Sequence, residues 1–113
     1  MQTTHIDVTN VAQFAGATEL RGNYIVLSSA GLNPMPRLRS VFGALQLVGR
    51  TKLPELTDIN GPLGVSGESS LPQLRFVGGG LFVAGGTLYA HNLTLIRGAV
   101  RVYGGGHVSQ EVK

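Results

Sequence analysis

Three histidines are the side chains of this sequence best suited to metal binding or to proton transfer near neutral pH. His91 and His107 lie sixteen residues apart, and His5 stands near the start of the chain. A metal site needs three or four ligands close together, yet the acid nearest to His107 is Glu111, in a tail where fraying is expected. The chain has no cysteine, which excludes thiolate ligands and disulfides. We therefore expect exposed histidines in turns and no metal site.

Acid–base and nucleophilic catalysis also lack a matching set of residues. The six acids occupy unrelated positions, so no pair recurs as a general acid and base. The serines lie in turn-like contexts without a nucleophile elbow. The glycine triplets 78–80 and 104–106 lack the Gly-Lys-Ser/Thr that completes a phosphate-binding loop. We expect no catalytic residue, no cofactor and no enzymatic activity.

A four-residue phrase recurs every eighteen positions through the middle of the chain, at 35–38, 53–56 and 71–74. Its form is Leu-Pro-x-Leu, with Met in place of the first leucine at 35. Units that start at the final leucine begin at Leu38, Leu56, Leu74 and Leu93. The third unit carries one extra residue, which we expect within 87–92. Self-similarity at a fixed period of this length indicates a solenoid or a related repeat fold.

The units agree column by column, with aliphatic residues at positions four, eight and ten and glycine at positions six and twelve. In unit order, the columns are Val41, Ile59, Val77 and Ile96; Gly43, Gly61, Gly79 and Gly98; Leu45, Leu63, Leu81 and Val100; Leu47, Val65, Val83 and Val102; Gly49, Gly67, Gly85 and Gly104. Position sixteen holds Leu53, Leu71, Tyr89 and Val108. Alternate residues therefore face one side, which is the period of a β-strand. Two glycines in each unit, and the proline that recurs in the turn, disfavour a helix.

The repeat predicts an all-β fold: a short single-stranded parallel β-helix, or β-solenoid, of about five 18-residue coils plus a partial N-terminal coil. One domain covers 1–113, with the partial coil at 1–16, the repeats at 17–108 and a tail at 109–113. Each coil has one or two short strands, near 41–49, 59–67, 77–85 and 96–104. The glycine columns mark corners, and the Leu-Pro-x-Leu phrase forms a further, apolar corner.

The N-terminal third fits the repeat more loosely. A unit that starts at Ala17 places Leu20, Gly22, Tyr24 and Val26 in columns four, six, eight and ten, and then needs a longer turn through 31–34. Ile6, Val8 and Phe14 fit the last part of an incomplete unit before it. No capping helix is apparent at either end of the chain.

The phrase L-P-x-L-x-x-[IV]-x-G-x-L-x-[IV]-x-G resembles the leucine-rich β-helical repeats of receptor L domains and related bacterial leucine-rich solenoids, over about 17–108. The resemblance implies an architecture and no particular function. The coils are shorter than in that family and lack its disulfide-rich modules, so receptor ligand binding is not implied. Left-handed hexapeptide helices of acyltransferases also have about eighteen residues per coil, but the glycine that follows their aliphatic residue is absent here.

A candidate partner-binding face follows from the same alternation. If columns four, eight and ten point inward, columns nine and eleven point outward, and a solvated sheet face should be mostly polar. Here several of these outward residues are apolar, and a ladder of them would form a contiguous patch. The predicted face consists of Ile25, Leu27, Gln46, Val48, Phe82, Ala84, Arg101 and Tyr103.

Charge and hydropathy favour a protein partner. The net charge is +3, and the basic pairs Arg37/Arg39 and Arg50/Lys52 have no flanking aromatic residue, so nucleic-acid binding is not expected. The apolar runs are too short for a membrane span and the N-terminus lacks a leader-like run, which favours a cytoplasmic protein.

Three function classes remain open. The first is a non-catalytic protein-binding module, and the small size would suit an inhibitor encoded by a phage or mobile element and acting in the host cytoplasm. The alternative is a structural subunit of a virion or filament, such as a decoration, tail or fibre protein, and the third is a hexapeptide-type acyltransferase. In each case uncapped ends and an apolar ladder predict a homo-oligomer, with a two-fold dimer favoured.

Overall fold

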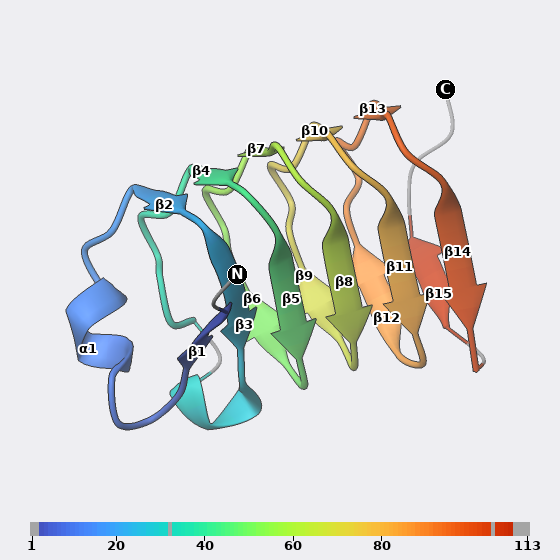
Figure 1. Ribbon diagram of the computed structural model, residues 1–113. Helices are drawn as coiled ribbons and strands as arrows, with labels where there is room; N and C mark the ends of the chain where they lie inside the picture. Colours follow the sequence, from blue (N-terminus) through green and yellow to red (C-terminus); the bar gives the residue numbers. More distant parts are fainter. Residues whose placement is uncertain (1–2, 32, 105, 110–113) are drawn as a thin grey trace.

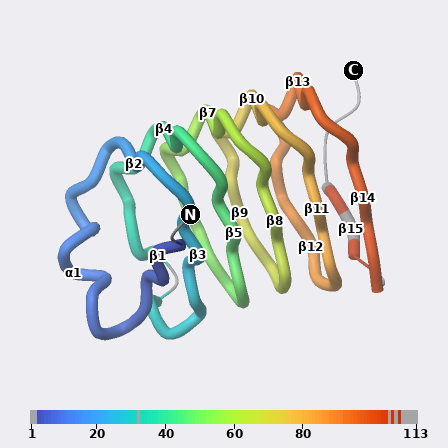
Figure 2. The backbone as a smooth tube through the Cα atoms, in the orientation of Figure 1, coloured from blue at the N-terminus to red at the C-terminus, as the bar shows by residue number. Residues whose placement is uncertain are grey.

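Short parallel strands, separated by glycine and proline corners, follow one another along the chain and build a three-sided β-solenoid. A computed structural model describes residues 3–31, 33–104 and 106–109 (Figure 1). Within this part of the chain, each strand pair is parallel and joins strands of successive coils. The tube in Figure 2 shows these coils as successive turns, with the N-terminal segment at one end. The all-β solenoid fold predicted from the repeat is confirmed.

Three sheets form the sides of the solenoid, counted over the described residues. Sheet A has six strands in the order β1 (Thr3–Ile6), β3 (Asn23–Val26), β5 (Leu45–Val48), β8 (Leu63–Ser66), β11 (Leu81–Ala84) and β14 (Val100–Tyr103). Sheet B has five, in the order β2 (Glu19–Arg21), β4 (Ser40–Phe42), β7 (Asp58–Ile59), β10 (Phe76–Val77) and β13 (Leu95–Ile96). Sheet C has four, in the order β6 (Thr51–Lys52), β9 (Ser69–Ser70), β12 (Thr87–Tyr89) and β15 (His107–Ser109).

The corner between sheets B and A requires glycine because successive coils stack there backbone on backbone. A Cβ atom added at Gly61 would lie 2.5 Å from the carbonyl oxygen of Gly43 in the preceding coil. The corner between sheets A and C requires glycine for the same reason and for a second one. A Cβ added at Gly67 would lie 2.8 Å from the Cα of Gly49, and Gly67 has φ +107°, a conformation that L side chains rarely adopt. Both glycine columns therefore allow successive coils to stack closely.

The Leu-Pro-x-Leu phrase makes the third corner, between sheet C and sheet B of the next coil. The Leu56 N–H donates to the Leu53 carbonyl at 3.4 Å, and both leucine side chains are fully buried. Pro54 fits the turn because its fixed φ suits the position and its missing N–H is not needed there. The corner therefore anchors each coil in the core.

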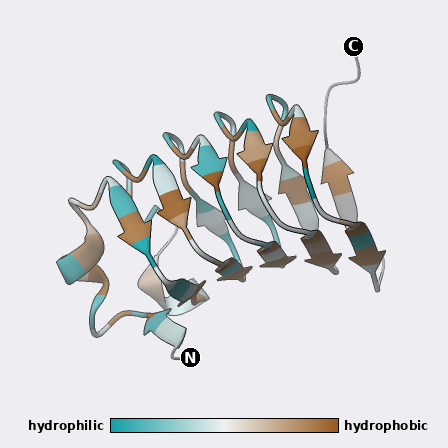
Figure 3. Ribbon diagram, turned by 45° about the horizontal axis from the view of Figure 1, so that its top comes forward, coloured by the Kyte–Doolittle hydropathy of each residue, from teal (hydrophilic) through white to brown (hydrophobic). Residues whose placement is uncertain are grey.

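The core is a stack of aliphatic layers that runs through the coils. Its fully buried members include Leu38, Val41, Leu47, Leu53, Leu56, Ile59, Leu63, Leu71, Leu74, Val77, Leu81, Val83 and Leu88. Hydrophobic segments recur from coil to coil in Figure 3. Since one coil cannot enclose these side chains alone, the neighbouring coils supply the packing.

Each coil from β4 onward contains three strands, where we expected one or two. The expected strand 41–49 is broken into β4 and β5 at Gly43–Ala44, and β6 follows as a third side. The alternation of inward residues continues through the break, because Val41, Leu45 and Leu47 are all buried. A pattern of alternating residues therefore did not reveal the corner within it.

The position predicted for the extra residue of the third unit is wrong. Val83 pairs with Val65, eighteen positions earlier, whereas Leu88 pairs with Ser69, nineteen positions earlier. Gly86 stacks on Gly67, also nineteen positions earlier, so the insertion lies between 83 and 86, before the predicted range 87–92. As a consequence Tyr89 is an outward residue, 40% exposed. Buried Ala90 follows it, so the assignment of Tyr89 to column sixteen is wrong.

Val108 is also displaced from column sixteen. It pairs with Leu88, which in turn pairs with Ser69. Ser69 pairs with Thr51, so the inward column of sheet C holds two hydroxyl side chains followed by two aliphatic ones. The Thr51 and Ser69 side chains are buried, and neither hydroxyl oxygen has a hydrogen-bond partner among the described residues.

The N-terminal segment differs from the predicted end of an incomplete coil. Ile6 pairs with Val26 and is buried, so it belongs to the middle of a coil, while Val8 is 69% exposed. Phe14 lies on a four-residue helix, α1 (Val11–Phe14), and its ring meets Tyr24 edge-on at 6.1 Å. A 3₁₀ turn, η1 (Ser28–Ala30), replaces the sheet C strand of the next coil. The N-terminal end is therefore covered, contrary to the expectation that neither end has a helix.

Candidate functional site

The outer face of sheet A brings the predicted partner-binding residues into two rows. The strand register aligns Ile25, Gln46, Gly64, Phe82 and Arg101 in the first row. The second row contains Val48, Ser66, Ala84 and Tyr103. Leu27 directly follows β3 at the start of η1 and is half-buried. All eight predicted residues are therefore on or next to this sheet, in the order that the repeat implied.

The predicted continuous ladder is interrupted in its middle. The coil that contains β8 contributes only Gly64 and Ser66 to the two rows, so no large side chain covers the sheet there. On one side stand Ile25, Gln46 and Val48, and on the other stand Phe82 and Tyr103, which are 37% and 50% exposed. The face consists of two groups of large side chains with a gap between them.

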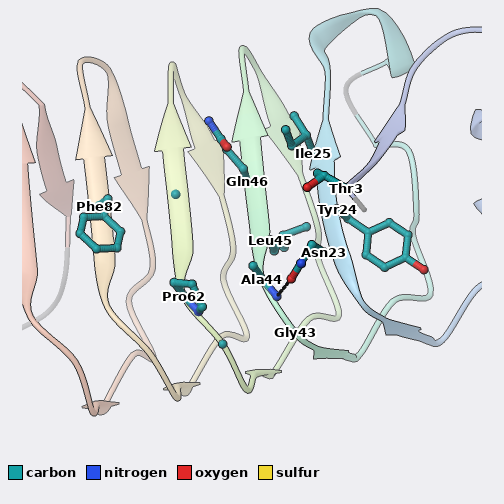
Figure 4. A pocket seen from close by; sticks show the side chains of 12 residues that line it. Thr3, Asn23, Tyr24, Ile25, Gly43, Ala44, Leu45, Gln46, Pro62 and Phe82 are labelled. Atoms are coloured by element: carbon teal, nitrogen blue, oxygen red, sulfur yellow. Dashed lines mark hydrogen bonds between the residues drawn. The ribbon is translucent and has the colours of Figure 1, made fainter. Parts of the chain in front are cut away.

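This gap is part of a shallow depression of about 580 Å³ that extends from sheet A to the corner with sheet B. Phe82 lies at one side of it and Ile25 and Thr3 lie at the other, with Gln46 between them and Pro62 at the corner (Figure 4). Gly64 lies under it, and a Cβ added there would meet the Gln46 side chain at 3.4 Å, an ordinary contact. Glycine at the outward position of β8 therefore leaves this part of the depression without a side chain on its floor.

Two hydrogen bonds fix the corner that lines the depression. The Asn23 carboxamide oxygen accepts a hydrogen bond from the Ala44 N–H at 3.3 Å, and the Tyr24 hydroxyl donates to the Arg21 carbonyl at 3.2 Å. These bonds hold the corner in place, while the exposed Gln46 amide offers a donor and an acceptor. None of the lining residues is a His, Asp, Glu, Lys or Cys.

The sequence predicted the two rows of outward residues on sheet A but not the depression between them. Gly64 occupies an outward position of a strand, where glycine weakens the strand and often marks a close approach by another group. That signal was present in the sequence. The contribution of Asn23 and Pro62 was not, because both lie at a corner that the strand pattern did not show.

The described histidines and acids lie on different parts of the solenoid, and of the histidines His5 is on the outer face of sheet A. In the described part of the chain, no three His, Asp, Glu or Cys side chains are close enough to hold a metal ion. His5 precedes Ile25 in the first outward row, and His91 lies at a Leu-Pro-x-Leu-type corner. The side chain of His107 and all of Glu111 fall outside the described residues.

Asp7 is held in a turn rather than in a reactive site. Hydrogen bonds from the Thr9 hydroxyl and the Thr9 N–H to its carboxylate keep the pKa of Asp7 below the ordinary value. Asn10 closes the same turn, because its side-chain oxygen accepts from the Asp7 N–H at 2.8 Å and its amide donates to the His5 carbonyl at 2.7 Å. The turn leads directly into α1.

Sheet B carries arginine side chains stacked on phenylalanine rings. The Arg21 guanidinium lies 4.8 Å from the centre of the Phe42 ring, and Arg97 lies 5.9 Å from that of Phe76. Arg21 also bonds to Glu19 at 2.9 Å. The arginines cover part of each ring, which explains how two phenylalanines are accommodated on an outer face.

No protein-family model matches the chain, and no curated protein or solved structure is significantly similar to it. The structure thus defines the class of the protein as a parallel β-solenoid. No helix in the described residues has the length and apolarity needed to cross a membrane.

Proposed function

We propose that this chain is a non-catalytic protein-binding module that presents the outer face of sheet A to a partner. The observation that carries the proposal is the depression over Gly64, with exposed Phe82 on one side and Gln46 on the other. An aromatic side chain beside a concavity is the arrangement that binding hot spots favour.

Rigidity of the face supports the same function. Each strand of sheet A pairs with its neighbours through backbone hydrogen bonds, and the inward side chains of these strands are packed in the core. A partner would therefore meet a preformed surface and lose little free energy to ordering it. An inhibitor of a host protein, encoded by a phage or mobile element, remains one form of this proposal.

We also propose that this chain is related to leucine-rich solenoids. Its support is the Leu-Pro-x-Leu corner, whose leucines are fully buried in successive coils. Solenoids of stacked repeats commonly bind partners on an extended face, and sheet A is the widest face here.

The test is capture of partners by a surface variant and by a matched control. Phe82→Glu places a charge beside the depression, and Phe42→Glu places one on sheet B, where the native ring is exposed to nearly the same extent, 39% against 37%. A partner held by the wild type and by Phe42→Glu should be lost with Phe82→Glu. Gly64→Val, which fills the depression without adding charge, should weaken the same partner.

Circular dichroism and urea unfolding must first show that all three variants fold. If every partner of the wild type still binds Phe82→Glu and Gly64→Val at full affinity, the proposal is wrong. If Phe42→Glu alone abolishes binding, the partner-binding face is on sheet B.

A structural subunit of a virion or filament is the second candidate. The observation that favours it is the exposed last coil, in which Val100 and Val102 are 53% and 47% exposed. Light scattering that finds large assemblies of the purified chain would favour this candidate over the first.

A further inference from the structure

A second depression, of about 180 Å³, lies on sheet C, on a different side of the solenoid from the candidate face. Strands β6, β9 and β12, which lie side by side in Figure 1, and the residues just before β6 and β9 form its lining. Two cations, Arg50 and Lys52, line it, whereas the depression on sheet A has no charged residue in its lining. The two depressions therefore suit different ligands.

The register of sheet C sets three hydrogen-bond donors in one outward row. Lys52 pairs with Ser70, and Ser70 pairs with Tyr89. Each of the three follows a buried residue of its strand, so its side chain points away from the core. Neighbouring strands lie about 4.8 Å apart, so the two ends of the row are about 10 Å apart. The short Ser70 thus stands between two longer side chains.

These three donors have no partner within the described part of the chain. The Lys52 ammonium, the Ser70 hydroxyl and the Tyr89 hydroxyl form no hydrogen bond or ion pair there. Lys52 and Tyr89 are exposed, and Ser70 is half-buried. Each donor is thus accessible to a ligand that enters the depression.

The charges that line the depression include one positive charge in excess. Glu68 lies 3.6 Å from Arg50 in an ion pair, which balances these two charges. Lys52 has no acidic partner among the described residues, so two cations and one carboxylate face the depression. The electrostatic potential there favours an anion.

We infer that this depression binds a phosphate group, held over Ser70 between Lys52 and Tyr89. A phosphate group has three terminal oxygens that are strong acceptors, and the row offers one donor to each of them. Charge-assisted bonds to such oxygens are about 2.5–2.9 Å long, so a tetrahedral group over Ser70 lies within reach of the longer side chains on both sides. A carboxylate has two oxygens and would leave one donor unused. This site is separate from the partner-binding face on sheet A and does not depend on it.

Titration with inorganic phosphate, followed by nuclear magnetic resonance at neutral pH and constant ionic strength, tests for the site because it both detects and locates weak binding. The backbone amides of 50–52, 68–70 and 87–89 should shift together and saturate in the millimolar range, the affinity of a site with few contacts. Acetate should bind more weakly than phosphate. Phenyl phosphate distinguishes a site for phosphate esters, which it should saturate as well as inorganic phosphate does, from a site for free phosphate, which it should not.

Two single substitutions should change the affinity in opposite directions. Lys52→Gln should weaken phosphate binding about tenfold, because it removes a charge-assisted hydrogen bond. Glu68→Gln should strengthen phosphate binding, because it removes the carboxylate and keeps the size of the side chain. Arg75→Gln is the matched control: it changes the net charge as Lys52→Gln does, at an exposed position outside the depression, and should leave the affinity unchanged.

Ser70→Val tests the position of the phosphate without a change of charge. It fills the depression and removes the middle donor, so it should weaken binding about tenfold or more. Ser40→Val, at a half-buried outward position of β4 on sheet B, is the matched control. Circular dichroism and urea unfolding must show that every variant folds. Phosphate shifts centred outside sheet C, equal affinities of Lys52→Gln and Arg75→Gln, weaker binding by Glu68→Gln, or wild-type affinity of Ser70→Val would each overturn the inference.

Discussion

Replacement of Gly61 by alanine tests whether the corner between sheets B and A is as closely packed as the structure describes. The added Cβ would lie 2.5 Å from the carbonyl oxygen of Gly43 and 3.1 Å from the backbone nitrogen of Ala44. Ordinary contact begins at 3.4 Å, so the two coils must separate there by about 0.9 Å. The φ of Gly61 is not in the left-handed region, so this substitution measures stacking alone.

The cost has two parts. Overpacking that forces a backbone shift costs about 1–3 kcal/mol. The shift also stretches the hydrogen bonds from the Gly61 N–H to the Gly43 carbonyl, at 3.0 Å, and from the Gly79 N–H to the Gly61 carbonyl, at 3.1 Å. Weakening such bonds costs about 1 kcal/mol. We expect Gly61→Ala to lower the free energy of unfolding by about 3 kcal/mol, a large share of the ~5–15 kcal/mol of a typical domain.

Gly64→Ala is the matched control in the same coil. Its added Cβ meets only the flexible Gln46 side chain, at 3.4 Å. Glycine within a strand costs about 0.5–1 kcal/mol relative to alanine, so this variant should be as stable as the wild type or slightly more stable. Urea unfolding followed by far-ultraviolet circular dichroism measures both, with unchanged m-values as the sign of two-state behaviour. Equal stability of Gly61→Ala and Gly64→Ala would refute the stacked-glycine account.

Three further predictions concern the core and the N-terminal turn. Thr51→Val should raise the free energy of unfolding by about 1 kcal/mol, since it removes a buried hydroxyl without a partner; a loss of stability would mean that this hydroxyl is bonded in solution. Leu56→Ala, at a fully buried position, should lower the free energy of unfolding by about 2–5 kcal/mol. Leu95→Ala, at a side chain 47% exposed, should lower that of the monomer by less than about 1 kcal/mol in urea unfolding at low concentration. Asp7→Asn should lower stability at neutral pH, because the lowered pKa of Asp7 stabilises the folded state above the ordinary value of 3.8. That difference should disappear as the pH falls through the folded pKa, and a difference that persists at pH 2 would show that the charge is not responsible.

The repeat predicted most of the fold because its columns correspond directly to layers of the core. Val41, Ile59 and Val77 stack in sheet B, as their shared column implied. The corners within the expected strands could not be predicted from alternation, since Val41 and Leu45 keep the same parity on both sides of the Gly43–Ala44 break. Short helices were equally difficult to predict, because the four residues of α1 span only about one helical turn.

The sequence predicted which residues form the rows of the candidate face, but it did not predict the shape of that face. Outward parity placed Gln46 and Phe82 correctly, and the strand register confirms that they belong to one row. Whether large side chains touch across that row depends on the residue between them, Gly64. The depression also extends to a corner whose position the pattern did not show, so its lining needed three-dimensional information.

The register divides each coil into a part of constant length and a part of variable length. Six positions separate sheet B from sheet A in successive coils, from Val41 to Leu47 as from Ile96 to Val102. The interval from sheet A to sheet C grows instead, from four positions between Val65 and Ser69 to five and then six in the next two coils.

From β4 onward, changes of length are thus confined to a single edge of the solenoid. The corner between sheets B and A keeps one length from coil to coil, whereas the edge at Gly85–Gly86 accommodates an additional residue while Val83 and Leu88 stay paired with the preceding coil. Gene duplication and slippage could therefore lengthen coils at that edge while the core stayed in register. The same edge is where a foreign peptide could be inserted for display, aligned with others from coil to coil along the length of the molecule.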